Sequence, residues 1–195
     1  EVKQIISASA IGIYPDSLTN IYHETDLDID VSFLGNVVKQ WENEVSQFEK
    51  LEIIVSKIRI GIVLAKNGGA LQEMAKPIQY GVGAAFGSGE QYQSWIHLHD
   101  LAAIFSHVIE NNRSGVYNGV SPYPVTNEAL TQAIAKTLEK PLFLPNIPKF
   151  IMKLILGEMH ILLFSSQHVS CRKLLDENFQ YKFASLDKAL NDLLK

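Results

Sequence analysis

The run KIRIGIVLA at residues 57–65 is the feature that most restricts the fold of this chain. Its apolar residues alternate with polar ones at first and then become continuous, which is the pattern of a buried parallel strand. The break NGGA ends the strand, and the residues after it predict a helix through Met74 to Tyr80. Strand-like runs at residues 2–7 and 115–120 also alternate with helical segments, so the sequence predicts an α/β fold.

Apolar residues at helical spacing predict amphipathic helices between these strands. The first covers residues 31–48 and is expected to face the core, with Asp30 as its cap. Asp100 and Thr126 are expected to cap the next two helices. The three apolar stripes are Leu34, Val37, Val38, Trp41, Val45 and Phe48; Leu101, Ile104, Phe105, Val108 and Ile109; and Leu130, Ile134 and Leu138.

The pattern changes after Pro141, because prolines at 141, 145 and 148 mark a linker. Short helices are expected over 148–156, 159–165, 170–176 and 185–194, and the last carries one apolar stripe. The most apolar stretch, 147–164, contains Lys149, Lys153, Glu158 and His160, which argues against a helix that crosses a bilayer. A pair of buried helices is the favoured interpretation, and binding to a membrane surface is the alternative.

Composition excludes several classes of protein. The chain has 195 residues and a formal net charge of −4, which offers no basic patch for nucleic acid. Cys171 is alone, so no disulfide framework exists, a packing role is expected for its thiol, and a cytoplasmic setting is expected for the protein.

Six segments occur in an order that resembles a known family: SASAIGIYP, FLGNVVKQWE, RIGIVLAKNGGALQEM, GSGEQYQSWIHLHDL, GVYNGVSPYPVTN and LGEMHILLFSSQHV. The chain resembles an uncharacterised subgroup of extended short-chain dehydrogenase/reductases, labelled NAD-dependent epimerase family or SulA-like proteins. The resemblance implies the C-terminal part of a Rossmann-type parallel sheet, with a partial NAD(P)-binding and substrate region at 1–145. It also implies a small helical C-terminal domain of unknown function at 146–195.

The resemblance implies an epimerase or oxidoreductase that binds NADP(H) or NAD(H) and a small-molecule substrate, but two departures qualify it. No Gly-rich dinucleotide turn occurs, so the front half of the Rossmann domain is expected to lie outside this sequence, and cofactor binding is expected only when that half is present. Aligning Glu42 with the family motif also puts Leu34 and Val38 at the Tyr and Lys of the catalytic pair. The alternative is therefore a non-catalytic nucleotide-binding or protein-interaction scaffold.

The candidate site residues follow from this frame. Ser9 and Tyr14, near the end of the first strand, are the candidate catalytic hydroxyls, and the alternative for Tyr14 is a structural role in which its ring packs under the loop. The resemblance places Ile62 and Val63 against the nicotinamide. It also places Gln91, Trp95 and His97 in a loop that would close over a substrate.

Two further possibilities are open at the level of sequence. The motif HLHD at 97–100 invites a metal site, but Asp100 is needed as a helix cap and no third ligand is in reach, so no metal is predicted. Helix 31–48 could form a homodimer through a helical bundle between subunits, or it could be buried within one monomer. His160 and His168 are expected to be structural or surface residues.

Overall fold

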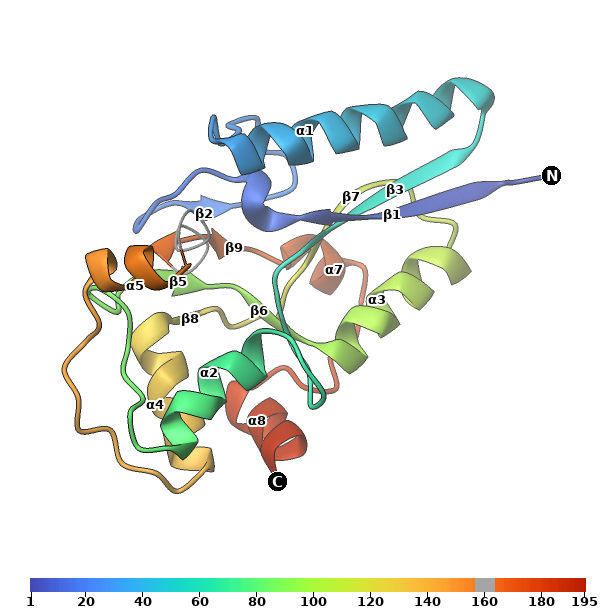
Figure 1. The fold of residues 1–195 in the computed structure, drawn as a ribbon. Helices are drawn as coiled ribbons and strands as arrows, with labels where there is room; N and C mark the ends of the chain where they lie inside the picture. The colour runs from blue at the N-terminus through green and yellow to red at the C-terminus, as the bar shows by residue number, and fades with distance from the viewer. Residues whose placement is uncertain (157–163) are drawn as a thin grey trace.

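A computed structural model describes residues 1–156 and 164–195 of the chain. Its central sheet contains three parallel strands in the order β1 (Gln4–Ala10), β3 (Ile54–Ile60) and β7 (Gly115–Gly119), which lie side by side in Figure 1. Gln4 lies opposite Ile54, and Ile60 lies opposite Gly119. The prediction of an α/β fold with a parallel sheet is confirmed.

Two helices cover the opposite faces of this sheet (Figure 1). Helix α1 (Phe33–Ser46) lies on one face and α3 (Leu98–Glu110) on the other. Helix α3 buries Leu101, Ile104 and Val108 of its predicted stripe, whereas Ile109, at the end of that stripe, is 53% exposed. The 3-10 helices η1 (Ile11–Ile13) and η2 (Gln47–Leu51) follow β1 and α1.

The prediction that the apolar stripe of residues 31–48 faces the core is wrong for most of its members. Leu34, Val37, Trp41 and Phe48 are 38–47% exposed, whereas the buried residues of α1 are Gly35, Val38 and Glu42. The face of α1 that packs on the sheet carries a carboxylate, because Glu42 forms an ion pair with Arg59 of β3. A polar buried pair therefore decides the orientation of α1 against its own apolar periodicity.

Helix caps follow the prediction in one case and differ in two. Thr126 caps α4 (Asn127–Thr137), where its hydroxyl accepts from Ala129 N at 3.2 Å. Ser32, and not Asp30, caps α1 by accepting from Gly35 N, while Asp30 accepts hydrogen bonds from Ser32.

Asp100 does not cap α3, because its two oxygens have distant partners. His97 Nδ1 accepts from His99 N at 3.0 Å and caps the helix instead. The Asp100 carboxylate accepts from the backbone N–H groups of Lys182 and Phe183 at 3.0 and 2.8 Å. It thereby joins α3 to the chain that precedes the last helix.

The run at 57–65 is divided in two. After β3, Gly61 leads into β4 (Ile62–Leu64), which pairs in parallel with β6 (Trp95–His97). A Cβ on Gly61 would lie 2.2 Å from the carbonyl oxygen of Ser94, so this close approach requires glycine. Short strands complete the structure: β5 (Tyr92–Gln93) pairs with β8 (Val125–Thr126), and β2 (Ile21–Tyr22) with β9 (His168–Val169).

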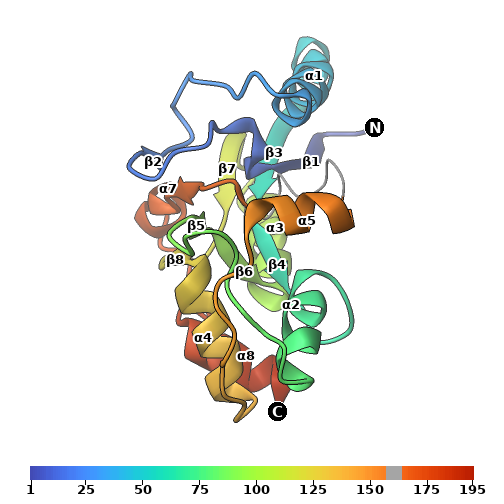
Figure 2. The ribbon, with the colours of Figure 1, turned by 60° about the vertical axis from the view of Figure 1, so that its left-hand side comes forward.

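A second core lies among α2 (Ala70–Gln79), α4 and the last helix, α8 (Leu186–Leu194). Figure 2 shows α8 beside α4 at the end of the molecule away from α1. The predicted stripe of α8 is confirmed, since Ala189, Leu190 and Leu193 are buried.

The other tail helices are α5 (Lys149–Leu156) and α7 (Arg172–Asp176). The prediction that α5 is buried is wrong at Phe150 and Leu154, which are 73% and 88% exposed. The helix lies on the surface, and a surface helix packs only one of its sides against the rest of the protein. His160 and most of the helix predicted at 159–165 lie outside the described residues. No helix in the described part of the chain has the length and apolar content to cross a membrane.

Candidate functional site

A cleft of about 440 Å³ lies at the carboxyl ends of β1 and β3, where sheets of parallel strands usually bind ligands. Most of its wall is aliphatic or glycine, and its polar residues come from β5, from Ser94 and from the chain before β9. The lining residues are Ala10, Ile11, Gly12, Leu34, Val38, Ile60, Gly61, Ile62, Val63, Gly69, Ala70, Tyr92, Gln93, Ser94, Ser165 and Gln167. A mainly apolar space with a few polar groups is typical of a small-molecule site.

The positions that the resemblance assigns to the catalytic pair form part of this wall. Leu34 and Val38 stand one turn apart on α1, and both line the cleft. Aliphatic side chains neither donate nor accept protons, so this wall lacks the acid–base groups that the pair would supply. Ile62 and Val63, the predicted nicotinamide contacts, line the same cleft.

Ser9 and Tyr14 are not among the lining residues, because both belong to a buried hydrogen-bonded cluster. Ser9 Oγ donates to Glu42 Oε1 at 2.6 Å. Arg59 donates through Nε and Nη2 to the two Glu42 oxygens at 2.9 Å, and through Nη1 to Tyr14 Oη at 2.9 Å. All four residues are at most 7% exposed, so the two predicted catalytic hydroxyls are engaged in packing β1, α1 and β3 together.

The environment of Tyr14 keeps its hydroxyl protonated. Burial raises the pKa of Tyr14 above its ordinary value, although the charge of Arg59 opposes this. The hydroxyl lies 2.8 Å from Asn118 Oδ1 and 3.1 Å from the carbonyl oxygen of His23, to which it can donate. A protonated donor of this kind cannot serve as a base at neutral pH.

The carboxylate of Glu42 stays charged for a different reason. Burial by itself would raise its pKa, but hydrogen bonds from Arg59 and Ser9, together with the charge of Arg59, hold the pKa of Glu42 below its ordinary value. The cluster is therefore an ion pair with satisfied partners, which is the form in which buried charges persist.

Gln91, Trp95 and His97 are predicted to lie on a loop over the substrate, but the structure buries them outside the cleft lining. Trp95 is fully buried in the core of α2, α4 and α8, and its Nε1 donates to the carbonyl oxygen of Tyr123 at 3.0 Å. Gln91 Nε2 donates to the carbonyl oxygen of Phe86 at 3.1 Å. Strand pairing fixes this segment, and Tyr92, Gln93 and Ser94 reach the cleft instead.

His97 has a structural position between α3 and α8. Its ring stacks on Phe183 with the centroids 3.9 Å apart, and its Nε2 lies 3.3 Å from Asp192 Oδ2. Burial lowers the pKa of His97, although Asp192 opposes the shift. Within residues 1–156 and 164–195, no three His, Cys, Asp or Glu side chains are grouped to hold a metal ion.

The remaining residues named from the sequence are also part of the packing. Cys171 is 4% exposed, and burial raises the pKa of its thiol, as expected for a packed cysteine. The ring of His168 stacks on Tyr92 at 4.4 Å.

Two features of the site were not predicted from the sequence. The pairing of Arg59 with Glu42 could have been predicted in part from the sequence, because an arginine inside a buried strand needs a partner of opposite charge. The position of Gln93 in the cleft could not have been predicted, since a neutral glutamine in a polar loop matches no sequence motif.

The chain is similar to known proteins in sequence and in fold. Residues 147–193 match the model of a domain of unknown function, DUF1731. An epimerase family protein of Staphylococcus aureus is 38% identical over 194 residues, which cover 99% of this chain and 64% of that protein. The crystal structure of human epimerase family protein SDR39U1 (isoform 2) with NADPH matches with a TM-score of 0.86 and 32% identity, over 96% of this chain and 64% of that chain.

A more distant structure has the same fold. The nucleoside-diphosphate sugar epimerase from Corynebacterium glutamicum matches with a TM-score of 0.80 and 26% identity, over 98% of this chain and 37% of that chain. The chain thus spans 64% of the length of the Staphylococcus and human relatives. By sequence and by fold, the chain is similar to epimerase family proteins, and its C-terminal part matches the DUF1731 domain.

Proposed function

We propose that the protein binds a nicotinamide dinucleotide, with the nicotinamide end beside a small-molecule substrate in the cleft. The observation that supports this most is the position of the cleft at the carboxyl ends of β1 and β3, in a fold shared with a relative whose structure contains NADPH. No Gly-rich turn for the pyrophosphate occurs in this sequence, so the proposal assigns residues only for the nicotinamide end.

The residues of the cleft fit that part of the cofactor. A nicotinamide is a flat ring with one carboxamide, and a cleft of about 440 Å³ with aliphatic walls has room for it and for a small substrate. Ile62 and Val63 would lie against the ring, while Leu34 and Val38 would exclude water from it. When bound, the cofactor would supply the capacity to give or take a hydride.

A second candidate function is binding of the dinucleotide without turnover. It is favoured by Leu34 and Val38, which leave the α1 wall without a proton donor, and by the engagement of Ser9 and Tyr14 in the buried cluster. A redox-sensing scaffold would need only the cofactor site, whereas a reductase would also need a proton from a substrate, a water molecule or a residue beyond this wall.

Titration with NADPH distinguishes these functions when it is applied to the protein as its gene encodes it. The fluorescence of bound NADPH would report binding, and loss of NADPH absorbance with a panel of carbonyl compounds would report turnover. Saturable binding with turnover supports the reductase or epimerase, and saturable binding without turnover supports the scaffold. The absence of saturable binding would contradict both.

Gly12→Leu tests whether the cofactor uses this cleft. A Cβ on Gly12 would meet no atom within 4 Å, so the larger side chain should fill the cleft without disturbing the backbone. We expect weaker NADPH binding with an unchanged unfolding midpoint. Gln40→Leu, on an exposed position of α1, is the matched control and should bind NADPH as the wild type does.

A further inference from the structure

Gln93 lines the cleft, and its side chain forms no hydrogen bond with any of the described residues. The residue is 2% exposed and lies at the end of β5. None of the described residues forms a hydrogen bond with its side-chain amide, although its backbone belongs to the β5–β8 pair. The Gln93 amide atoms are not among the fully buried unpaired atoms of the described residues, so they face the open space of the cleft, where water or a ligand can bind them.

The neighbouring polar side chains of the cleft, Ser94 and Gln167, are hydrogen-bonded to backbone groups around it. Ser94 Oγ donates to the carbonyl oxygen of Gln167 at 2.7 Å and accepts from Val169 N at 2.9 Å. Gln167 Nε2 donates to the carbonyl oxygen of Tyr14 at 2.7 Å. Gln93 therefore differs from both, because its carbonyl and its NH₂ group are both available to a molecule in the cleft.

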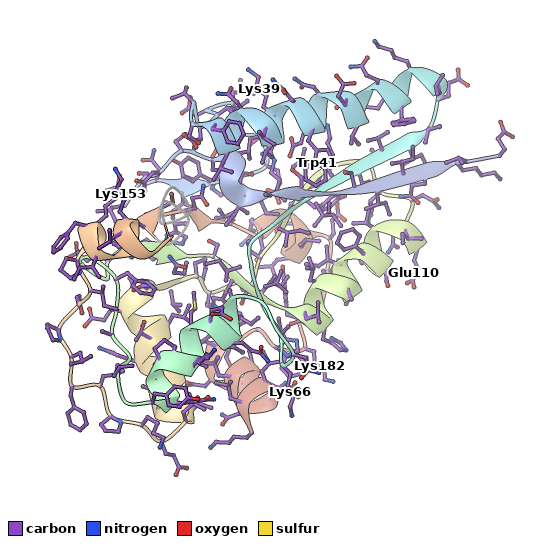
Figure 3. All side chains as sticks on the ribbon, viewed as in Figure 1. Lys39, Trp41, Lys66, Glu110, Lys153 and Lys182 are labelled. Carbon is purple, nitrogen blue, oxygen red and sulfur yellow. The ribbon has the colours of Figure 1, made fainter. Side chains whose placement is uncertain are left out.

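The cleft carries no charge on any of its described lining residues. Arg59, the nearest cation in the sheet, already donates to Glu42 and Tyr14. Lys39 of α1 and Lys153 of α5 are exposed, and Figure 3 shows them on the outer sides of their helices. An anion placed among aliphatic walls without a cation would pay its full desolvation cost.

We propose that the substrate part of this cleft takes an uncharged, mainly apolar molecule, whose carbonyl or carboxamide group pairs with the Gln93 amide. The Corynebacterium structure is named for nucleoside-diphosphate sugars, and the chemistry of this cleft does not suit a diphosphate. The inference deepens the proposed function, since it rests on the cleft being the substrate site.

Two-dimensional amide NMR tests this directly, because the side-chain NH₂ signals of Gln93 are identified by their loss in Gln93→Leu. The probes are naphthalene carboxamide, its anionic isostere naphthalene carboxylate, and UDP-glucose, each added with and without saturating NADPH. We expect the Gln93 signals to shift with the carboxamide, and the dissociation constant for the carboxamide to rise about tenfold in Gln93→Leu. Gln132→Leu, an exposed glutamine on α4, is the matched control and should leave that constant unchanged.

Three results would overturn the inference. One is a Gln93 signal that does not move with the carboxamide. Another is a shift with the carboxylate or UDP-glucose at equal or lower concentration. The third is a shift with NADPH alone that leaves no response to the carboxamide, since this would assign Gln93 to the cofactor. Failure of NADPH to bind, with the carboxamide response intact, would instead contradict only the proposed cofactor.

Discussion

Arg59 is a buried charged residue of the central sheet, and its charge is compensated mainly by one carboxylate, that of Glu42. The side chains of Arg59 and Glu42 are each 9% exposed, and two hydrogen bonds join them. The guanidinium also lies 5.0 Å from the centre of the Tyr14 ring, to which it donates at the hydroxyl. The same arginine thus fixes the orientation of α1 and holds the loop after β1.

Replacing Arg59 with methionine should be strongly destabilising, because Glu42 would remain buried without its partner. Breaking a pair of this kind costs about 3–5 kcal/mol, which urea unfolding would measure. Arg172→Met is the control, since Arg172 pairs with Asp176 on the surface, where the two side chains are 72% and 58% exposed. That change should cost less than about 1 kcal/mol. Equal effects of the two changes would contradict the role of the buried pair.

The same pair predicts how stability depends on pH. The pKa of Glu42 is lower in the folded protein than its ordinary value of 4.5, so the unfolded chain binds a proton more readily. The stabilisation by the pair is therefore complete above about pH 4.5 and is lost as the pH falls through the lowered pKa. Urea midpoints of the wild type and of Glu42→Gln should converge as the pH falls from neutral to about 3. A constant difference between the midpoints would be inconsistent with this sign.

At the scale of single elements, the Asp100 carboxylate joins α3 to the chain before α8 and does not cap its own helix. Asp100 is 1% exposed, and its oxygens accept from two consecutive N–H groups before α8. Asp100→Asn retains the shape but replaces one acceptor with a donor, so one of these N–H groups would be left unpaired. We expect a loss of about 2 kcal/mol and faster hydrogen exchange at Lys182 or Phe183. Asp28→Asn, in an exposed loop, should change neither quantity.

The elements were predictable where their signal is local. The run KIRIGIVLA and the cap at Thr126 depend on residues within a few positions; the cap is found where expected, and the run is extended as expected but is divided at Gly61 into β3 and β4. The partners of Asp100 lie 82 and 83 residues away, so nothing near it in the sequence distinguishes an acceptor for those groups from a helix cap.

In the candidate site, too, the positions set by local sequence were predictable and those set by distant contacts were not. Aligning the motif at Glu42 placed Leu34 and Val38 correctly on the cleft wall, because helical spacing is local. The removal of Ser9 and Tyr14 into a cluster depends on Arg59, which lies 45 residues from Tyr14. The role proposed for Gln93 depends on its side chain having no hydrogen-bond partner among the described residues, which only the three-dimensional structure can show.

At the scale of the whole molecule, the last helix shares one core with the earlier part of the chain. Leu190 and Leu193 of α8 belong to the same buried cluster as Leu130 and Ile134 of α4 and Leu71 of α2. The segment that matches DUF1731 therefore covers side chains that would otherwise be open to water. Burial of this kind couples the two parts in unfolding, because neither keeps its core alone.

Leu190→Ala should consequently destabilise the whole chain. Leu190 is fully buried, and truncating such a leucine costs about 2–5 kcal/mol through lost transfer free energy and the cavity that remains. Unfolding followed by far-ultraviolet circular dichroism and by tryptophan fluorescence should give one shared midpoint, lowered in the variant, because Trp95 lies in the same core. Leu154→Ala, at a side chain that is 88% exposed, should leave the midpoint within the error of the wild type. Two separate transitions, with only one moved by Leu190→Ala, would mean that the tail folds as an independent unit.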